Sequence, residues 1–256
     1  MKNIYHHIST FASHNKKMFG VLIDPDKQNA AQLLETVSHC EQNSVDYIFV
    51  GGSIITKGDL NQTCRLIKEN CSIPVILFPG SPDQLSRYAD AILFLSLISG
   101  RNPKYLIESH VAATPTLSKL DLEIIPTGYL LVDCGTKTTA IYVSDTNPIP
   151  HDNAEIAATT ALAGEYLGLK LTYIDGGSGA KKCISTDMIS ATKNKLSGPL
   201  IIGGGIRSAE SAEKIYSAGA DLIIVGNGIE EKRQLIKEIA AVKSSHNVLI
   251  DSVKGV

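Results

Sequence analysis

Three glycine-rich segments in the second half of the sequence have the composition and spacing of a ligand-binding site. They are residues 175–179 (Asp-Gly-Gly-Ser-Gly), 203–208 (Gly-Gly-Gly-Ile-Arg-Ser) and 226–228 (Gly-Asn-Gly). Glycines let backbone N–H groups approach an anion closely, and the N-terminus of a following helix adds about half a positive charge. A single segment of this kind could equally be a tight turn, but three together predict a phosphate-binding site.

Two carboxylates could add metal or acid–base chemistry to this site. Asp24 follows the apolar run 19–23, and Ser53 follows the next one, so that a carboxylate and a hydroxyl could together hold Mg²⁺. The alternative for Asp24, as for Asp26, is to cap the next helix. Asp175 could accept a proton from a substrate hydroxyl, and its structural alternative is an Asx turn.

Other common kinds of catalytic site are excluded. The seven histidines cluster near the N-terminus or stand alone, and no Ser-His-Asp, HExxH or Walker pattern occurs. The five cysteines are odd in number, widely spread and never in a CxxC pair, which predicts neither disulfides nor a zinc site. This cysteine usage is typical of a reducing cytoplasm.

The elements that must position these residues are short and apolar. Continuous apolar runs indicate strands buried on both faces, as in a parallel sheet covered by helices. Eight runs are present: residues 19–23, 47–50, 75–78, 91–95, 129–132, 171–174, 200–202 and 222–225. Amphipathic helices are predicted over residues 28–41, 60–69, 154–167, 209–218 and 230–242.

This alternation of strands and helices predicts an α/β fold, a (β/α)₈ TIM barrel formed by a single domain over residues 1–256, with an open doubly wound sheet as the alternative. Residues 81–88 and 121–128 are too short or too rich in Pro and Gly for helices, so the third helix is expected to be reduced. Residues 133–139 form a polar loop with no assigned role. A barrel gathers its active site at the carboxyl ends of the strands, where the glycine segments, Asp24 and Ser53 lie.

Composition limits the partners. With 24 Lys plus Arg against 26 Asp plus Glu, the chain has a net charge of −2 and no overall attraction for nucleic acid or anionic lipid. No apolar run approaches the roughly 18 residues of a membrane span, and residues 1–17 lack the apolar stretch of a secretory signal. We therefore expect a soluble cytoplasmic protein with no stable membrane insertion.

The sequence resembles the geranylgeranylglyceryl phosphate synthases and the PcrB-like prenyltransferases along nearly its whole length. The GGGIR and GN elements also occur in other phosphate-binding barrels, but their combination with LIDPDK and YIDGGSG is much more selective. The matching segments are residues 22–27 (LIDPDK), 50–53 (VGGS), 95–103 (LSLISGRNP), 173–179 (YIDGGSG), 203–207 (GGGIR) and 225–227 (VGN).

The resemblance implies Mg²⁺-dependent transfer of a prenyl group, usually geranylgeranyl, from its diphosphate to the C3 hydroxyl of sn-glycerol 1-phosphate. It implies Asp24 and Ser53 as metal ligands, Asp175 as the catalytic carboxylate, a homo-oligomer (dimer or hexamer), and at most transient membrane contact. The residues implied to bind glycerol phosphate are Tyr173, Ile174, Asp175, Gly176, Gly177, Ser178, Gly179, Gly204, Gly205, Gly226 and Asn227.

The sequence departs from the family pattern at two places. Many members carry Glu at the position of Asp175 and Ala at that of Gly176. Some have Lys at the position of Leu22, which leaves the diphosphate to Mg²⁺, Lys27 or Arg101 here.

The prenyl tail requires an apolar trough, and the alternative for each candidate residue is ordinary core packing. Two other functions stay open: another phosphate-binding TIM-barrel isomerase or synthase, and a non-catalytic phosphoglycerol-lipid binder. The residues placed to line the trough are Phe94, Leu95, Leu97, Ile98, Tyr105 and Leu130.

Overall fold

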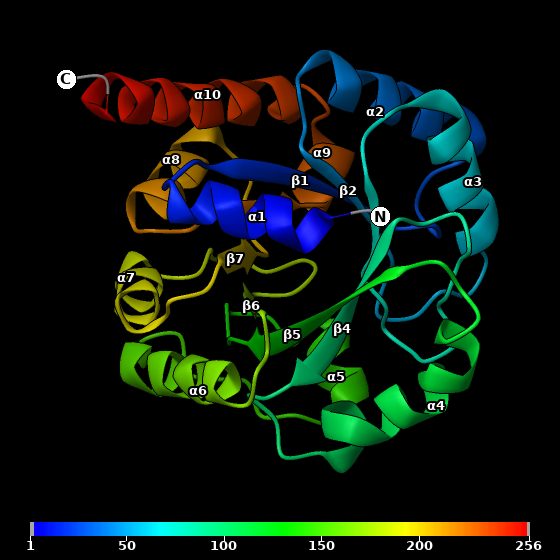
Figure 1. Ribbon diagram of the computed structural model, residues 1–256, viewed down its shortest axis with the longest axis horizontal. Helices are drawn as coiled ribbons and strands as arrows, with labels where there is room; N and C mark the ends of the chain where they lie inside the picture. The colour runs from blue at the N-terminus through cyan, green and yellow to red at the C-terminus, as the bar shows by residue number, and fades with distance from the viewer. Residues whose placement is uncertain (1–2, 255–256) are drawn as a thin grey trace.

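Eight parallel strands close into a barrel in chain order, with β8 pairing back onto β1 (Figure 1). This computed structural model describes residues 3–254, so the first two and last two positions of the expected domain 1–256 lie outside the described residues. The predicted (β/α)₈ TIM barrel is confirmed. The strands are β1 Met18–Ile23, β2 Tyr47–Val50, β3 Val75–Leu77, β4 Ala91–Leu97, β5 Glu123–Leu131, β6 Leu171–Asp175, β7 Leu200–Gly203 and β8 Leu222–Val225.

The strands bury side chains on both faces, as their continuous apolar composition predicted. Met18, Phe49 and Leu93 belong to the cluster that fills the barrel interior. Phe19 and Val21 belong to a second cluster, which packs the barrel against its helices. The alternation of side chains along each strand therefore decides which residues can reach the barrel interior.

The helices follow the strands, and some of them were not predicted. The five predicted segments are helical, but the last one is divided into α9 and α10 because Lys232 has an extended backbone. Helices α1, α4, α5 and α7 were missed. The helices are α1 Ile4–Ser13, α2 Ala30–Gln42, α3 Leu60–Asn70, the π-helix η1 Lys104–Glu108, α4 Ser109–Leu117, α5 Thr139–Ser144, α6 Ala154–Tyr166, α7 Thr186–Lys195, α8 Ala209–Ser217, α9 Asn227–Glu231 and α10 Leu235–Lys254.

The third βα unit has lost its helix. Residues 78–90, which connect β3 to β4, contain turns and bends but no helix, as expected. Residues 121–128 are not helical either, as expected, but β5 begins at Glu123, six residues before the predicted strand. Pro126 lies inside β5, paired in register with Phe94.

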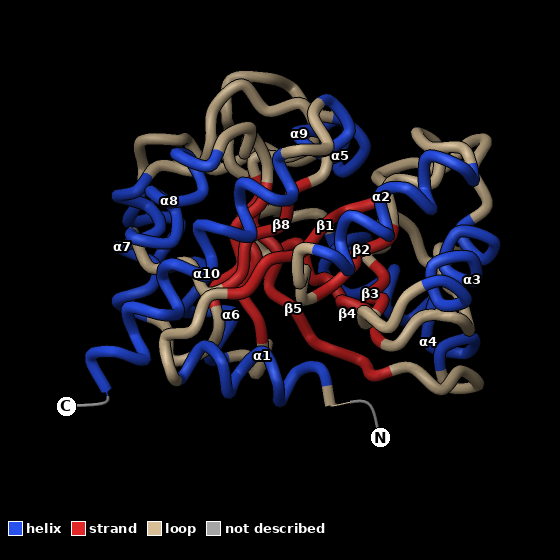
Figure 2. Tube along the Cα trace, turned by 90° about the horizontal axis from the view of Figure 1, so that it is seen from above, coloured by secondary structure: helices blue, strands red, loops and turns tan. Residues whose placement is uncertain are grey.

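The two ends of the barrel are closed differently (Figure 2). Helix α1 lies across the amino-terminal end, where Ile4 and Ile8 join the interior cluster. The Glu123 carboxylate accepts hydrogen bonds from the backbone N–H of Ile4 at 2.6 Å and of Tyr5 at 2.9 Å, which fixes the start of the helix. Helices α5 and α9 and the long loops lie at the opposite end, where the carboxyl ends of the strands open.

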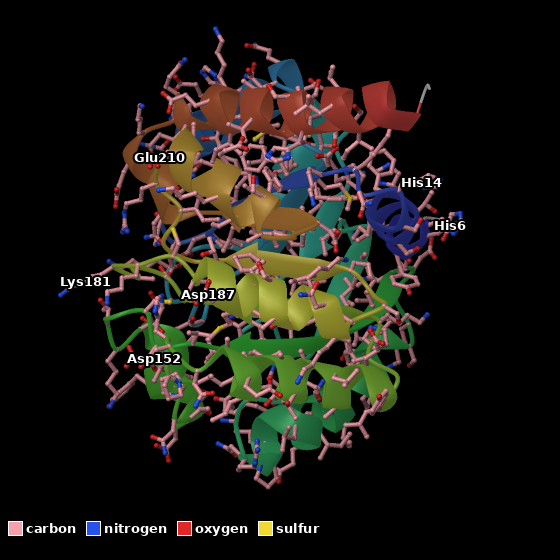
Figure 3. The ribbon with its side chains drawn as sticks, turned by 90° about the vertical axis from the view of Figure 1, so that its left-hand side faces the viewer. His6, His14, Asp152, Lys181, Asp187 and Glu210 are labelled. Atoms are coloured by element: carbon pink, nitrogen blue, oxygen red, sulfur yellow. The ribbon has the colours of Figure 1, made fainter. Side chains whose placement is uncertain are left out.

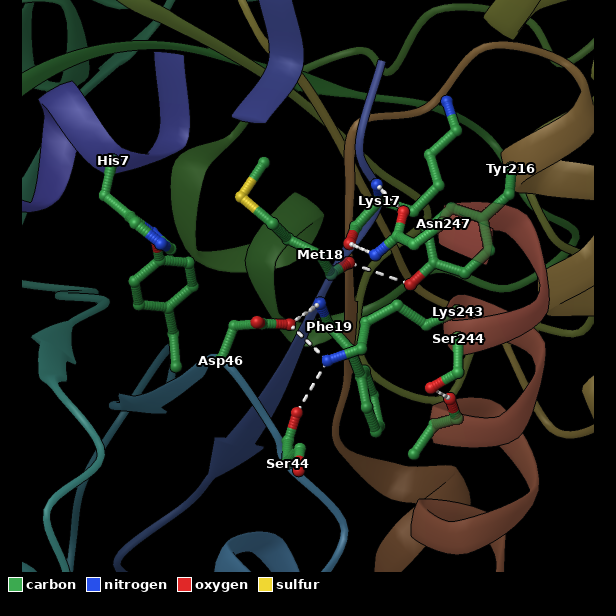
Figure 4. Close-up of polar contacts among 12 residues, drawn as sticks. His7, Lys17, Met18, Phe19, Ser44, Asp46, Tyr216, Lys243, Ser244 and Asn247 are labelled. Atoms are coloured by element: carbon green, nitrogen blue, oxygen red, sulfur yellow. Dashed lines mark hydrogen bonds and ion pairs between the residues drawn. The ribbon is translucent and has the colours of Figure 1, made fainter. Parts of the chain in front are cut away.

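A hydrogen-bonded network ties α10 to β1 and to the segment before β2 (Figure 4). Lys243 Nζ lies 2.9 Å from Asp46 Oδ2, and the same oxygen accepts from Phe19 N at 2.7 Å. Asn247 accepts from the backbone N–H of Lys17 at 2.7 Å and donates to its carbonyl at 3.0 Å. The last helix is thus anchored to the first strand. Within residues 3–254, no helix combines the length and apolarity needed to cross a membrane.

Candidate active site at the barrel mouth

A cavity of about 290 Å³ opens at the carboxyl ends of the strands. Its walls come from the segments after β1, β2, β3, β6, β7 and β8, from β4 and β5, and from η1, α4 and α5. Most of the predicted site residues therefore share one space. Those that line it are Asp24, Ser53, Tyr173, Asp175, Gly177, Ser178, Gly179, Gly204, Gly205, Gly226 and Asn227.

Ile174 and Gly176 are not among the residues that line the cavity, which differs from the expectation. Ile174 alternates with Tyr173 along β6, so its side chain is fully buried between the barrel and the helices. Gly176 donates its N–H to the Gly203 carbonyl at 3.0 Å, and a Cβ on it would lie 2.9 Å from Cys134 Sγ. The polar loop 133–139, which had no assigned role, thus supports the back of the β6 loop.

The glycine-rich loops pack against one another. Gly204 has φ +85°, and a Cβ there would lie 2.7 Å from the backbone nitrogens of Gly176 and Gly177. The Ser178 hydroxyl bridges to the loop after β8 by donating to Asn227 Oδ1 at 2.8 Å. Glycine is therefore required at position 204 both for its backbone conformation and for the close approach of the two loops.

Asp175 is a buried carboxylate with both oxygens hydrogen-bonded. Its side chain is 6% exposed. Oδ2 accepts from the Tyr129 hydroxyl at 2.6 Å, and Oδ1 accepts from Gly177 N at 2.7 Å. Burial raises the pKa of Asp175, while these two donors favour the ionised form. The arrangement is suited to a carboxylate that takes up a proton inside a cavity.

Aromatic rings form a wall beside Asp175. Phe78 and Tyr173 stack with ring centroids 5.3 Å apart, and Tyr129 meets both edge-on. All three rings line the cavity. Such a wall presents π faces that can stabilise a positive charge developing nearby.

Asp24 lies with Lys27 and Glu230 at the rim of the same cavity. Lys27 Nζ is 3.1 Å from Glu230 Oε2 and 3.7 Å from Asp24 Oδ2. A Cβ on Gly52 would lie 3.3 Å from the Asp24 carboxylate, so the backbone preceding Ser53 runs directly beside that carboxylate. The capping alternative for Asp24 and Asp26 is wrong, because Asn29 caps α2.

The donor atoms at this rim fit a hard cation. Two carboxylates and the Ser53 hydroxyl supply oxygen, the ligand type that Mg²⁺ prefers. Among residues 3–254, no group of three or more His, Cys, Asp or Glu side chains is arranged to hold a metal alone. These residues therefore suit an ion whose remaining ligands come from water and a phosphate-bearing substrate.

Lys27 and Arg101 were expected as partners for the diphosphate, and Arg207 is a third basic residue near the cavity. Lys27 and Arg207 line the cavity. Arg207 also donates to the Ala180 carbonyl at 2.7 Å and pairs with Glu231 at 3.5 Å. Arg101 instead directs its guanidinium to the carbonyls of Ile98 and Gly100, and it does not line the cavity.

The apolar part of the cavity uses both faces of β4. Leu93, Leu95 and Leu97 line it from the barrel side, whereas Ile92 and Phe94 line it from the helix side. Of the predicted trough residues, Phe94, Leu95, Leu97 and Tyr105 are in place. Ile98 and Leu130 are not in the lining, because both pack in the layer between barrel and helices.

Helix α4 covers the outer face of this trough. Ala113 and Leu117 line the cavity, as does His110, whose ring meets Phe94 edge-on at 4.4 Å. Burial lowers the pKa of His110, so its ring is neutral at pH 7. The trough is thus uncharged along α4.

The sequence reasoning missed several cavity residues. Tyr129 lies two residues before Leu131 on β5, so both side chains point to the same face of the strand, into the barrel and next to β6. Glu230 lies two residues after the Gly-Asn-Gly segment, a position that could have been read as part of the same loop. His110, Ala113 and Leu117 had no signal, because α4 itself was not predicted.

The histidines near the N-terminus lie far from this site. Figure 3 shows His6 and His14 on α1 at one end of the molecule, and Lys181 and Asp152 at the other. Lys181 belongs to the loop after β6, on the side of the mouth. His6 and His14 therefore lie at the closed end of the barrel.

The chain is similar to known proteins over most of its length. It is 52% identical to a geranylgeranylglyceryl phosphate synthase of Chitinophaga pinensis over 91% of this chain and 93% of that relative. It is 43% identical to that of Pyrococcus horikoshii over 86% of each chain.

A solved structure agrees with these sequence similarities. It is the (S)-3-O-geranylgeranylglyceryl phosphate synthase of Thermoplasma acidophilum in complex with substrate sn-glycerol-1-phosphate. The TM-score is 0.90 at 31% identity, over 96% of this chain and all of that one. The family model for PcrB matches residues 13–243, and the chain therefore belongs to the PcrB family.

Proposed function

We propose that this chain transfers a geranylgeranyl or similar prenyl group from its diphosphate to the C3 hydroxyl of sn-glycerol 1-phosphate, forming an ether-lipid precursor. The observation that carries the proposal is the continuity of one cavity from the glycine-rich loops to an apolar trough along both faces of β4. A phosphate ester suits the first part and a long hydrocarbon suits the second. The names of the similar proteins support the same reaction.

Glycerol 1-phosphate binds at the loops after β6, β7 and β8. Backbone groups of Ser178, Gly179 and Gly205 surround the phosphate, and Asn227 and Ser178 connect the loops at either side of it. Ile174 and Gly176 contribute through the backbone that positions Asp175 and Gly177. The remaining members of the set, Tyr173, Gly204 and Gly226, shape the walls of this end of the cavity.

Asp175 accepts the proton of the C3 hydroxyl as that oxygen attacks the allylic carbon. Tyr129 and Gly177 hold the carboxylate in one orientation, so its remaining acceptor positions face the cavity. Fixing the hydroxyl and the base in advance removes much of the entropic cost of the reaction. The rings of Phe78, Tyr129 and Tyr173 face the positive charge that develops on the prenyl group.

Mg²⁺ is the proposed cofactor, with Asp24 and Ser53 as its ligands. When bound, the ion supplies charge neutralisation for the departing diphosphate. Lys27 lies beside Asp24 and lines the cavity, so its ammonium adds positive charge for the same anion. The tail extends along Phe94, Leu95, Leu97 and Tyr105 toward α4.

The setting of the enzyme follows from the same reasoning. The five cysteines are all free, which agrees with a cytoplasmic location. We infer one domain over residues 1–256 and a homo-oligomer, either a dimer or a hexamer. Membrane contact is transient and serves the delivery of an apolar substrate and the release of an apolar product.

The test is product formation from radiolabelled glycerol 1-phosphate with geranylgeranyl, farnesyl and longer prenyl diphosphates. Wild type and Asp24→Ala are compared in Mg²⁺ and in EDTA. We expect butanol-extractable label with wild type in Mg²⁺ only, because the other conditions remove the metal or its carboxylate ligand. A folded protein that binds glycerol 1-phosphate but forms no butanol-extractable product with any of the donors would contradict the proposal. The chain would then belong to the broader class of phosphate-binding barrels, including non-catalytic lipid binders.

A further inference from the structure

Both carboxylate oxygens of Asp26 accept hydrogen bonds from a loop of the neighbouring βα unit. Its Oδ2 accepts from the backbone N–H of Thr56 at 2.8 Å and from the Thr56 hydroxyl at 2.9 Å. Its Oδ1 accepts from the backbone N–H of Lys57 at 2.9 Å and of Gly58 at 2.6 Å. Four donors from three consecutive residues therefore converge on one side chain that takes no part in the chemistry proposed above.

The loop that Asp26 holds is the one that carries Ser53. Residues 51–58 run from the end of β2 toward α3, and Ser53 and Ile54 line the cavity. A second contact holds the start of the loop, where Gln84 Nε2 donates to the Gly52 carbonyl at 3.0 Å. The loop thus has two supports, one on each side of the residues that face the cavity.

Asp26 also contacts the other proposed metal ligand. Its backbone N–H donates to Asp24 Oδ1 at 3.0 Å. Close packing reinforces the junction, since a Cβ on Gly58 would lie 2.3 Å from the Pro25 carbonyl oxygen. One residue therefore orients the Asp24 carboxylate through its main chain and the Ser53 loop through its side chain.

We propose that Asp26 is a positioning residue for the metal site, which fixes the Ser53 loop against the Asp24 segment so that carboxylate and hydroxyl are presented to one ion. This inference rests on the proposed function, because it takes Asp24 and Ser53 as metal ligands. Groups that hold metal ligands in place typically account for about 10- to 100-fold in metal affinity. Asp26 acts through the two ligands and touches neither the ion nor the substrate.

Asparagine at position 26 tests the clamp with little change in shape. An amide has only one acceptor oxygen. In Asp26→Asn the NH₂ group must therefore face either the donors of Thr56 or the two backbone N–H groups of Lys57 and Gly58, and it can accept from neither. The matched control is Asp59→Asn, which changes the same charge at the far end of this segment. The Asp59 side chain caps α3 by accepting a hydrogen bond from Gln62 N at 2.9 Å, and it accepts none from residues 56–58.

Two readouts other than turnover are used on the full chain. Mn²⁺, a paramagnetic stand-in for Mg²⁺, is titrated and the free ion is followed by electron paramagnetic resonance. Limited trypsin cleavage after Lys57 reports directly on release of the loop. For Asp26→Asn we expect about a tenfold or larger rise in the Mn²⁺ dissociation constant and faster cleavage after Lys57, with both values close to wild type in Asp59→Asn.

The outcomes are distinct. Faster cleavage in Asp26→Asn with unchanged Mn²⁺ affinity would overturn the proposal, as would an equal loss of affinity in Asp59→Asn. If Asp26→Asn does not fold, Thr56→Val removes one of the four bonds and should weaken Mn²⁺ binding in the same direction; unchanged binding there overturns the proposal. Wild type that binds no Mn²⁺ either alone or with inorganic diphosphate present overturns it together with the metal role of Asp24, whereas wild type that binds Mn²⁺ without forming product contradicts only the proposed function.

Discussion

At the scale of single residues, the site depends on side chains whose hydrogen bonds are already made before any ligand is considered. Asp175 accepts hydrogen bonds from the Tyr129 hydroxyl and the Gly177 N–H, and Asp26 accepts hydrogen bonds from four donors in one loop. A carboxylate held in this way cannot turn, so its direction is decided by the fold. Such preorganisation suits both the proton-accepting role proposed for Asp175 and the positioning role proposed for Asp26.

Removing the Tyr129 hydroxyl should change the pH dependence of the reaction. Burial raises the pKa of Asp175, so wild-type kcat/KM should fall on acidification at a pH above about 3.9, the ordinary Asp value. The hydroxyl favours the ionised carboxylate; Tyr129→Phe should therefore raise the pKa of Asp175 further and move this acid limb to higher pH. A pH profile of kcat/KM for glycerol 1-phosphate checks the shift, and an unmoved limb would mean that Asp175 is not the base.

At the scale of elements, β4 and α4 together build the apolar trough. Ile92 and Phe94 face α4, while Leu93 and Leu95 face the barrel interior, and all four line the cavity. The π-helix η1 leads directly into α4 and brings Tyr105 to the cavity, where its hydroxyl donates to the Val143 carbonyl of α5 at 3.0 Å. We therefore expect the position of α4 against β4 to limit the length of the proposed prenyl tail.

A larger side chain inside this trough should discriminate against long tails. Ala113 is 7% exposed and lines the cavity, so Ala113→Phe fills space that the tail needs. We expect the KM for geranylgeranyl diphosphate to rise about tenfold or more, and that for shorter donors to rise less. Val111→Phe, on the exposed face of the same helix at 64% exposure, is the control and should behave as wild type. Equal effects in both variants would place the tail elsewhere.

Most strands could be predicted from the sequence because they are buried on both faces and therefore largely apolar. The first part of β5 could not, because Glu123, Pro126 and Gly128 interrupt its apolar pattern. Helix α4 could not, because Pro115 and the two threonines Thr114 and Thr116 interrupt its apolar pattern. The glycine loops, Asp24 and Asp175 were visible as local patterns. Tyr129 was not, since its place depends on which strand lies beside β5, whereas Glu230 follows the Gly-Asn-Gly segment closely enough to have been considered with it. Ile174 was included because the family resemblance covers residues 173–179 as one run.

At the scale of the whole molecule, contacts between the first strand and the last helix support the barrel, which the pairing of β8 with β1 closes. Lys243 and Asp46 are 8% and 17% exposed, and the Asp46 carboxylate also accepts from Phe19 N. The last helix is thereby held against β1 and the segment before β2. These contacts lie at the end opposite the mouth, so they affect the site only through the stability of the barrel.

Breaking this buried pair should destabilise the fold without altering the chemistry. Asp46→Ala leaves the Lys243 ammonium with only the Ser44 carbonyl as its acceptor, and the free energy of unfolding should fall by about 3 kcal/mol. Glu69→Ala breaks the exposed Arg65–Glu69 pair and should cost less than about 0.5 kcal/mol. Urea denaturation measures both values, and similar losses in the two variants would contradict a special role for the buried pair.

The missing helix after β3 bears on what size of ligand this scaffold can process. Were all eight repeats complete, every strand would be screened by its own helix, and a long molecule could leave the interior only through the mouth. Because residues 78–90 form no helix, the cavity can continue past the rim of β4 to its outer face. One of the eight βα repeats is therefore incomplete. A ligand whose length exceeds the depth of the barrel can extend through this place, so no wider barrel is needed. Supplying a helix there by design would be a route from a lipid-handling enzyme back to one confined to small phosphorylated molecules.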